Sequence, residues 1–173
     1  MIATTNLYAL EFWAAAHIAA GDAMLAPCGM TVNDIDAVLT VSPEQRQAWA
    51  EAEQQALVVP RAGLLPLLAA GNELQIRRTI RPWQGSGELD QLASALNLHL
   101  LTVWRAAQGD VLLCDRLGLA ETDRTVLRTV NEVLLLRWSQ LGVALGVPRP
   151  EVLPRLFTAA EPAFAAFVRS LSA

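Results

Sequence analysis

The sequence predicts a mainly α fold, a single-domain orthogonal or antiparallel bundle of about seven or eight helices over residues 1–173. Hydrophobic residues make up 53% of the chain and charged residues 17%, so there is enough apolar surface to build a core. The apolar residues lean to Ala and Leu, which favour helices, and few residues are aromatic or β-branched, which favour strands. In several segments they also recur at spacings of three and four, as one stripe along a helix does.

The first predicted helix covers about residues 5–20. Asn6 is suited to cap its start, and Gly21 supplies the left-handed residue that ends many helices. Residues 21–42 carry a weaker signal, and both a short helical turn and a brief strand stay open there.

The stretch "SPEQ" at residues 42–45 predicts the start of the next helix. Ser42 can cap, Pro43 fits the first helical position, and Gln45 can complete a capping box. The helix that follows, to about Leu57, is polar over most of its circumference, so we expect it on the surface.

A stop and a new start follow each other at Gly71 and Asn72. They predict two short helices, or one sharply kinked helix. The second ends by Arg81, because Pro82 disfavours helical geometry in the residue before it.

The later half of the chain contains the clearest helical periodicity. A helix is predicted from Glu88 to Ala107, a short one from Val111 to Leu117, the longest from Glu121 to Leu145, and a last one from Ala159 to Leu171. We expect the helices at 88–107 and 121–145 to pack antiparallel as the central pair. We find no internal repeat in the sequence.

Charge and hydropathy exclude several classes of protein. The net charge is -4 and the pI is near 5.1, which argues against general nucleic-acid binding. No apolar run reaches the roughly 18 residues that a membrane span needs, and there is no export signal, so we expect a cytoplasmic protein without direct membrane insertion. Cys28 and Cys114 are then expected to be two separate reduced thiols.

The sequence offers little for catalysis. There is no lysine for a phosphate-binding loop, no GxSxG turn, and no metal-ligand spacing among the histidines and cysteines. His99 falls on the apolar stripe of its helix, where a hydrogen-bonded core histidine is the favoured interpretation. We therefore predict a protein that is not an enzyme, with no cofactor and no metal.

Arginines gather in one stretch, "LQIRRTIRPW" at residues 74–83. One interpretation of Arg77, Arg78 and Arg81 is the solvated side of a short helix, with cations at the C-terminal end of its dipole. The other is a basic docking edge beside Trp83, because Arg and Trp are enriched where protein partners bind.

The five tryptophans divide into two groups by their sequence surroundings. Trp13, Trp104 and Trp138 lie on apolar stripes and are predicted core residues. Trp49 and Trp83 lie in polar surroundings and are candidate interface residues.

Three stretches, "LYALEFWAAAHI", "LLPLLAAGNELQIRRTIRPW" and "ELDQLASALNLHLLTVWRAA", follow one another in an order that resembles the SctK (HrpD-like) family of type III secretion accessory proteins. The resemblance covers about the first two thirds of the chain. The chain is shorter than many members, and its C-terminal third does not match.

This resemblance implies a non-enzymatic cytosolic adaptor that links the inner-membrane ring protein to the pod protein of the sorting platform. Arg77, Arg78, Arg81 and Trp83 would then contact an acidic partner. Two alternatives stay open: an all-α cytosolic chaperone for one client protein, and a helical small-molecule sensor with His99 lining a pocket.

Overall fold

The computed structural model describes residues 1–80, 82 and 87–156, and within them the fold is mainly α with one small two-stranded sheet. Eight of the ten α-helices found there have seven or more residues, in line with the number predicted. In chain order the elements are α1 (Ile2–Ala20), a 3-10 turn (Gly21–Met24), α2 (Leu25–Cys28), α3 (Val32–Thr40), α4 (Pro43–Ala52), β1 (Val58–Pro60), α5 (Leu64–Ala69), α6 (Glu73–Thr79), α7 (Gly87–Ala107), α8 (Val111–Leu117), α9 (Glu121–Thr129), α10 (Glu132–Ser139) and β2 (Gly146–Pro148).

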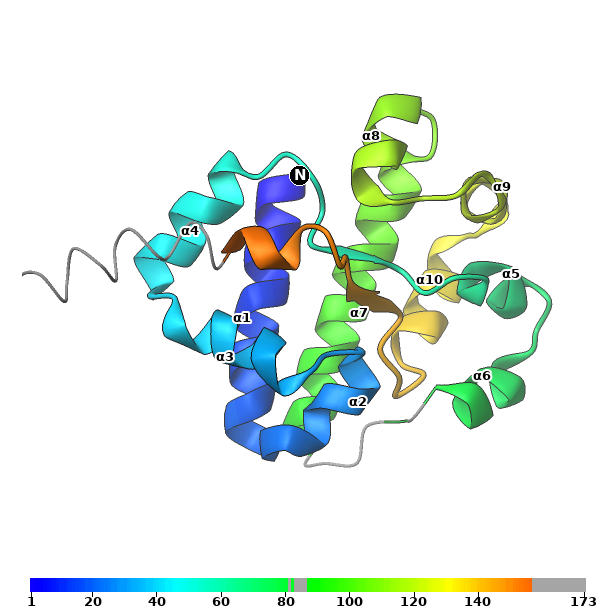
Figure 1. The fold of residues 1–173 in the computed structure, drawn as a ribbon. Helices are drawn as coiled ribbons and strands as arrows, with labels where there is room; N and C mark the ends of the chain where they lie inside the picture. The colour runs from blue at the N-terminus through cyan, green and yellow to red at the C-terminus, as the bar shows by residue number, and fades with distance from the viewer. Residues whose placement is uncertain (81, 83–86, 157–173) are drawn as a thin grey trace, which may run out of the picture.

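Two long antiparallel helices, α1 and α7, form the centre of the molecule (Figure 1), so the expected central pair of 88–107 with 121–145 is wrong. α4 packs against the outer side of α1, and α10 packs against α7. The predicted core tryptophans Trp13, Trp104 and Trp138 are all buried here. One continuous hydrophobic cluster includes residues from every helix named in this paragraph.

The order of elements repeats along the chain. α1 is followed by α2, α3, α4 and β1, and α7 is followed in the same order by α8, α9, α10 and β2. We call residues 2–80 the N-terminal half and residues 87–156 the C-terminal half. The prediction that the chain has no internal repeat is therefore wrong.

The repeat is also present in the amino-acid sequence. "ALVVPRAGLLPLL" at residues 56–68 and "ALGVPRPEVLPRL" at residues 144–156 are identical at eight of 13 positions. "NLYALEFWAAA" in α1 and "NLHLLTVWRAA" in α7 are identical at six of 11 positions. The repeat is weak in the sequence as a whole, because the two copies differ in helix length and in the polar residues between the matched stretches.

Equivalent residues make equivalent hydrogen bonds in the two halves. The buried Asn6 on α1 accepts from the backbone N–H of Leu57 at 2.6 Å, just before β1. The buried Asn97 on α7 accepts from the N–H of Leu145 at 3.1 Å, just before β2. Each central helix therefore holds the start of its own strand through one asparagine.

The two halves meet around an approximate two-fold axis. β1 and β2 pair antiparallel, with Val59 opposite Val147 at the centre of the ladder. The N–H of Arg61 donates to the carbonyl of Leu145 at 3.1 Å, and the N–H of Arg149 donates to that of Leu57 at 2.8 Å. Such exchanged bonds are what a two-fold relation between copies produces.

Three predicted helix boundaries are wrong. Asn6 is not a cap, because α1 begins at Ile2 and places Asn6 inside the helix. The helix predicted at 121–145 is two helices, because the Asn131 side chain accepts from the N–H of Leu134 and starts α10. The helix that begins at Pro43 ends at Ala52. The helix predicted at 159–171 lies outside the described residues.

Other local predictions are confirmed. Ser42 and Gln45 form the predicted capping box of α4. Gly71, in the left-handed region at φ 74°, separates α5 from α6, and α8 has the predicted bounds. Cys28 and Cys114 are buried free thiols.

The repeat predicts a stabilising substitution at the start of α9. In α3, the Thr31 hydroxyl donates to the Asp34 carboxylate at 2.8 Å, but the equivalent of Thr31 is Ala120, and Oδ1 of the equivalent Asp123 is buried without a hydrogen-bond partner among the described residues. Burial raises the pKa of Asp123, and the hydrogen bond from the N–H of Ala120 offsets part of that rise. We expect Ala120→Thr to increase the free energy of unfolding by about 1 kcal/mol.

Urea denaturation measures this gain. Ala120→Val, which has a similar shape but no hydroxyl group, is the matched control. Equal stability of the two variants would contradict the explanation.

Candidate functional site

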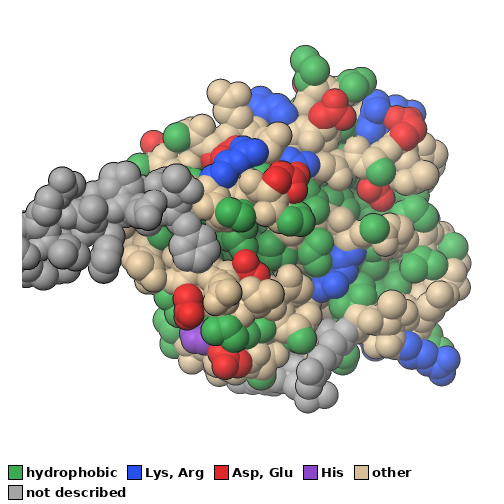
Figure 2. Space-filling view, viewed as in Figure 1, with side chains coloured by type: hydrophobic (Ala, Val, Ile, Leu, Met, Phe, Trp, Pro, Cys, Tyr) green, Lys and Arg blue, Asp and Glu red, His purple; other side chains and the backbone are tan. Residues whose placement is uncertain are grey.

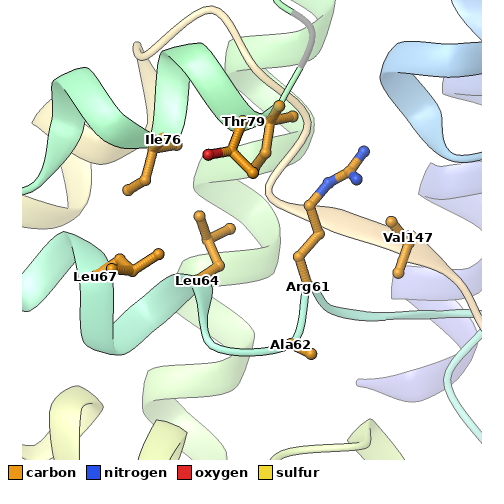
Figure 3. A pocket seen from close by; sticks show the side chains of 8 residues that line it. Arg61, Ala62, Leu64, Leu67, Ile76, Thr79 and Val147 are labelled. Atoms are coloured by element: carbon orange, nitrogen blue, oxygen red, sulfur yellow. The ribbon is translucent and has the colours of Figure 1, made fainter.

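A groove of about 350 Å³ lies between the α5–α6 pair and the strand β2 (Figure 3). Most of its lining is aliphatic, and Arg61 is the charged group in that lining. The groove is lined by Arg61, Ala62, Leu64, Leu67, Ile76, Thr79, Ile80 and Val147. Figure 2 shows the same face, with hydrophobic side chains across its middle and basic groups both among them and at the edge formed by α6.

The local sequence positions α5 and α6 as the two walls of this groove. Leu65 and Leu68 are buried on one side of α5, and Ile76 is the buried residue of α6. Gly71 turns the chain between the two helices. Glu73 then forms an ion pair of 2.9 Å with Arg137 on α10, which attaches the start of α6 to the bundle.

Arg61 is half-buried between Thr79 and Val147 (Figure 3). Its Nε donates to the carbonyl of Ala144 at 2.8 Å, and one Nη donates to the carbonyl of Pro27. These bonds connect three segments of the chain. None of the carboxylates in the described part of the chain forms an ion pair with Arg61, and its other Nη has no partner there.

The Cys28 thiol does not neutralise the positive charge of Arg61 either. Burial raises the pKa of the Cys28 thiol well above its usual range, and the smaller opposing effect of Arg61 does not reverse this. The thiol is therefore neutral. Burial lowers the pKa of Arg61 from its ordinary value, but a guanidinium keeps its proton at neutral pH. The groove thus presents a fixed positive charge beside an apolar surface.

The predicted contact residues Arg77 and Arg78 lie on α6, on the side of the helix opposite to Ile76 and Thr79, which line the groove. Both are exposed, and neither forms an ion pair with a described residue. Leu74, one turn earlier on the same helix, is 64% exposed. We call Leu74, Arg77 and Arg78 the α6 face. Arg81 and Trp83, also predicted contact residues, lie outside the described residues.

The expected surface position of Trp49 is wrong, because this side chain is only 7% exposed. The repeat gives the reason. Trp49 on α4 is equivalent to Trp138 on α10, and each packs into the core from the outer helix of its half. Of the polar residues around Trp49, Gln47 and Glu51 are exposed, while Arg46 is buried on the same side of α4 and pairs with Glu11 on α1.

His99 is hydrogen-bonded, as expected, but it is half-buried and not a core residue. Its Nε2 lies 3.1 Å from the Thr5 hydroxyl, and its ring stacks on that of Tyr8 with centroids 4.9 Å apart. Tyr8 and His99 are equivalent positions of the two halves, so the stack lies near the two-fold axis. Burial, and then the charged N-terminus, lower the pKa of His99.

Sequence reasoning missed Arg61. It follows a short strand that had no predicted counterpart, and it is separated from the arginine cluster of α6 by 15 residues of sequence. The one signal that identifies it is the shared "VPR" of the two matched stretches, at residues 59–61 and 147–149.

No family model, curated protein or solved structure matches the chain. Within residues 1–80, 82 and 87–156, no cluster of three or more His, Cys, Asp or Glu side chains is arranged to hold a metal ion. The helices of the same residues include none with the length and hydropathy of a membrane span.

Proposed function

We propose that this chain is a non-enzymatic cytosolic adaptor of a bacterial type III secretion system, which links the inner-membrane ring protein to the pod protein of the sorting platform. The α6 face is the observation that supports this proposal most directly. An exposed leucine beside two arginines that form no ion pair with a described residue is suited to bind a partner that carries apolar and acidic side chains.

Two further observations agree with a binding role. The groove beside Arg61 is a second surface with apolar residues and a positive charge, and it lies on the other side of α6 from the α6 face. The resemblance of the residues 64–107 region to the SctK family includes the stretch that forms α6.

Charge reversal tests the proposal. We expect Arg77→Glu with Arg78→Glu to reduce the recovery of the ring and pod proteins at least tenfold when the tagged chain is purified from cells that express all three. In this variant, the long-range attraction to an acidic partner becomes repulsion, and the direct contacts bring like charges together.

The matched control is Arg105→Glu with Arg128→Glu, which changes the net charge equally on other helices. Equal recovery with both double variants, at unchanged melting temperature, would exclude the α6 face as the contact. Recovery of one client protein in place of the ring and pod components would instead indicate a chaperone.

A further inference from the structure

The exposed side of α10 is apolar. Val133 is 74% exposed, and Leu136, three residues later and therefore on the same side of the helix, is 48% exposed. The other side of α10 packs into the core through Leu135 and Trp138. We call Val133 and Leu136 the α10 face. Because a helix at the surface of a bundle ordinarily exposes polar residues, the α10 face points to a contact outside the bundle.

The other half of the molecule shows that the fold does not require an apolar surface here. α4 is the equivalent of α10, and the capping residues Ser42 and Asn131 align the two helices. In this alignment, Glu44 and Gln47 stand in α4 where the α10 face stands in α10, and both are exposed. The outer side of this helix is thus polar in one half and apolar in the other, although its inner side packs into the core in both.

An ion pair connects the α10 face to the α6 face. Arg137, one turn after Val133 on the same side of α10, lies 2.9 Å from the carboxylate of Glu73 at the start of α6. Glu73 is followed directly by Leu74, and Arg77 lies one turn after it. The two faces therefore lie on either side of this ion pair and form one surface, with exposed apolar residues on both helices and arginines on α6.

The charge of this surface is opposite to that of the whole chain, which has a net charge of -4. Within α6 and α10, Glu73 and Arg137 neutralise each other. The remaining charged side chains are Arg77 and Arg78, which are positive, and Glu132, so the positive charges prevail. An acidic partner is attracted to such a surface, whereas a symmetric dimer of this chain would bring the arginines of two copies together.

We propose that the α6 face and the α10 face together bind an acidic amphipathic helix of a partner protein. Its apolar side packs on Leu74, Val133 and Leu136, and its carboxylates lie near Arg77 and Arg78. A helix fits because Val133 and Leu136 are one turn apart, the spacing at which the side chains of a second helix interdigitate. The inference rests on the proposed adaptor function, since a protein partner supplies the helix, and it adds the chemistry of the contact.

The probe is a fluorescent peptide of Leu and Glu with leucines at spacings of three and four and a length of about 15 residues, enough for a marginally stable helix. The same peptide with every Glu replaced by Gln is its control. Fluorescence anisotropy measures the dissociation constants. We expect the acidic peptide to bind at least tenfold more tightly than the control, although the chain as a whole repels it. Equal binding of the two, or no binding of the acidic peptide, would overturn the proposal.

Val133→Gln with Leu136→Gln removes the apolar contact of the α10 face. We expect an unchanged melting temperature, because α4 contains polar residues at the same positions, and binding of the acidic peptide weakened at least tenfold. The matched control is Ile18→Gln with Leu112→Gln, which changes residues of α1 and α8 that are 83% and 76% exposed. Equal binding by the two double variants would overturn the proposal.

The same variants separate this inference from the adaptor function. Peptide binding that depends on the α10 face, with no recovery of ring or pod proteins by the unchanged chain, would support the surface and contradict the type III assignment. Recovery of both proteins by Val133→Gln with Leu136→Gln at the level of the control variant would support the adaptor and overturn the α10 face as its contact. A dimer in light scattering that only this variant dissociates would identify an interface between copies and also overturn the proposal.

Discussion

We expect Gly146→Val to destabilise the fold by about 3 kcal/mol or more. The side chain of Val58, the equivalent residue of the other half, already fills the space that the new valine would need. A Cβ on Gly146 would lie 2.3 Å from Cγ1 of Val58 and 3.2 Å from Cδ1 of Leu100. Val58 and Gly146 are related by the two-fold axis. The site therefore has room for one valine only, and the chain places it in β1.

The exchanged variant, Val58→Gly with Gly146→Val, tests this explanation. It moves the valine to the other strand and keeps the total volume, so we expect it to be more stable than the sum of the two single changes predicts, by at least about 2 kcal/mol. Urea denaturation of the two single variants and the double variant gives the coupling energy. Additive effects would show that the two side chains do not compete for one space.

Replacement of Asn97 by leucine is the second large effect. Its side chain donates to the carbonyls of Ser139 and Val143, the latter at 2.8 Å, and accepts from the N–H of Leu145. All three bonds are buried. Leucine has a similar size but leaves three backbone groups without partners, so we expect a loss of about 4 kcal/mol in the free energy of unfolding.

Asn33→Leu, on the exposed side of α3, is the matched control for that variant, with an expected change within about 0.5 kcal/mol. Chemical denaturation at neutral pH compares the two. A change at Asn97 as small as the one at Asn33 would mean that the loop before β2 does not depend on this side chain. We expect Asn6→Leu, at the related position of α1, to be damaging for the same reason.

The elements that were predicted well are those whose start and end are encoded locally. Ser42 and Gln45 define one helix start, and Gly71 and Gly118 define two ends, through hydrogen bonds within a few residues of sequence. The break between α9 and α10 was missed because apolar spacing continues across it, while the cap at Asn131 competes with that periodicity.

The strands and the groove could not be predicted from local patterns. β1 and β2 have three residues each, and they are defined by their pairing with each other across 88 positions of sequence. The hydrophobic periodicity within one short segment contains no information about such a distant pairing. Arg61 is recognised as the counterpart of Arg149 only when the two halves are compared. The exposure of Arg77 and Arg78 could be predicted, because charged residues of a short amphipathic helix lie on its solvated side.

The stack of Tyr8 on His99 places two different residues where a dimer of identical subunits would bring a residue against its own copy. Because one polypeptide supplies both sides, each half is free to diverge, and of the arginine pair only Arg149 has a carboxylate partner among the described residues. The molecule therefore presents two different surfaces at the two ends of its pseudo-symmetry, whereas a dimer of identical subunits would present the same surface twice.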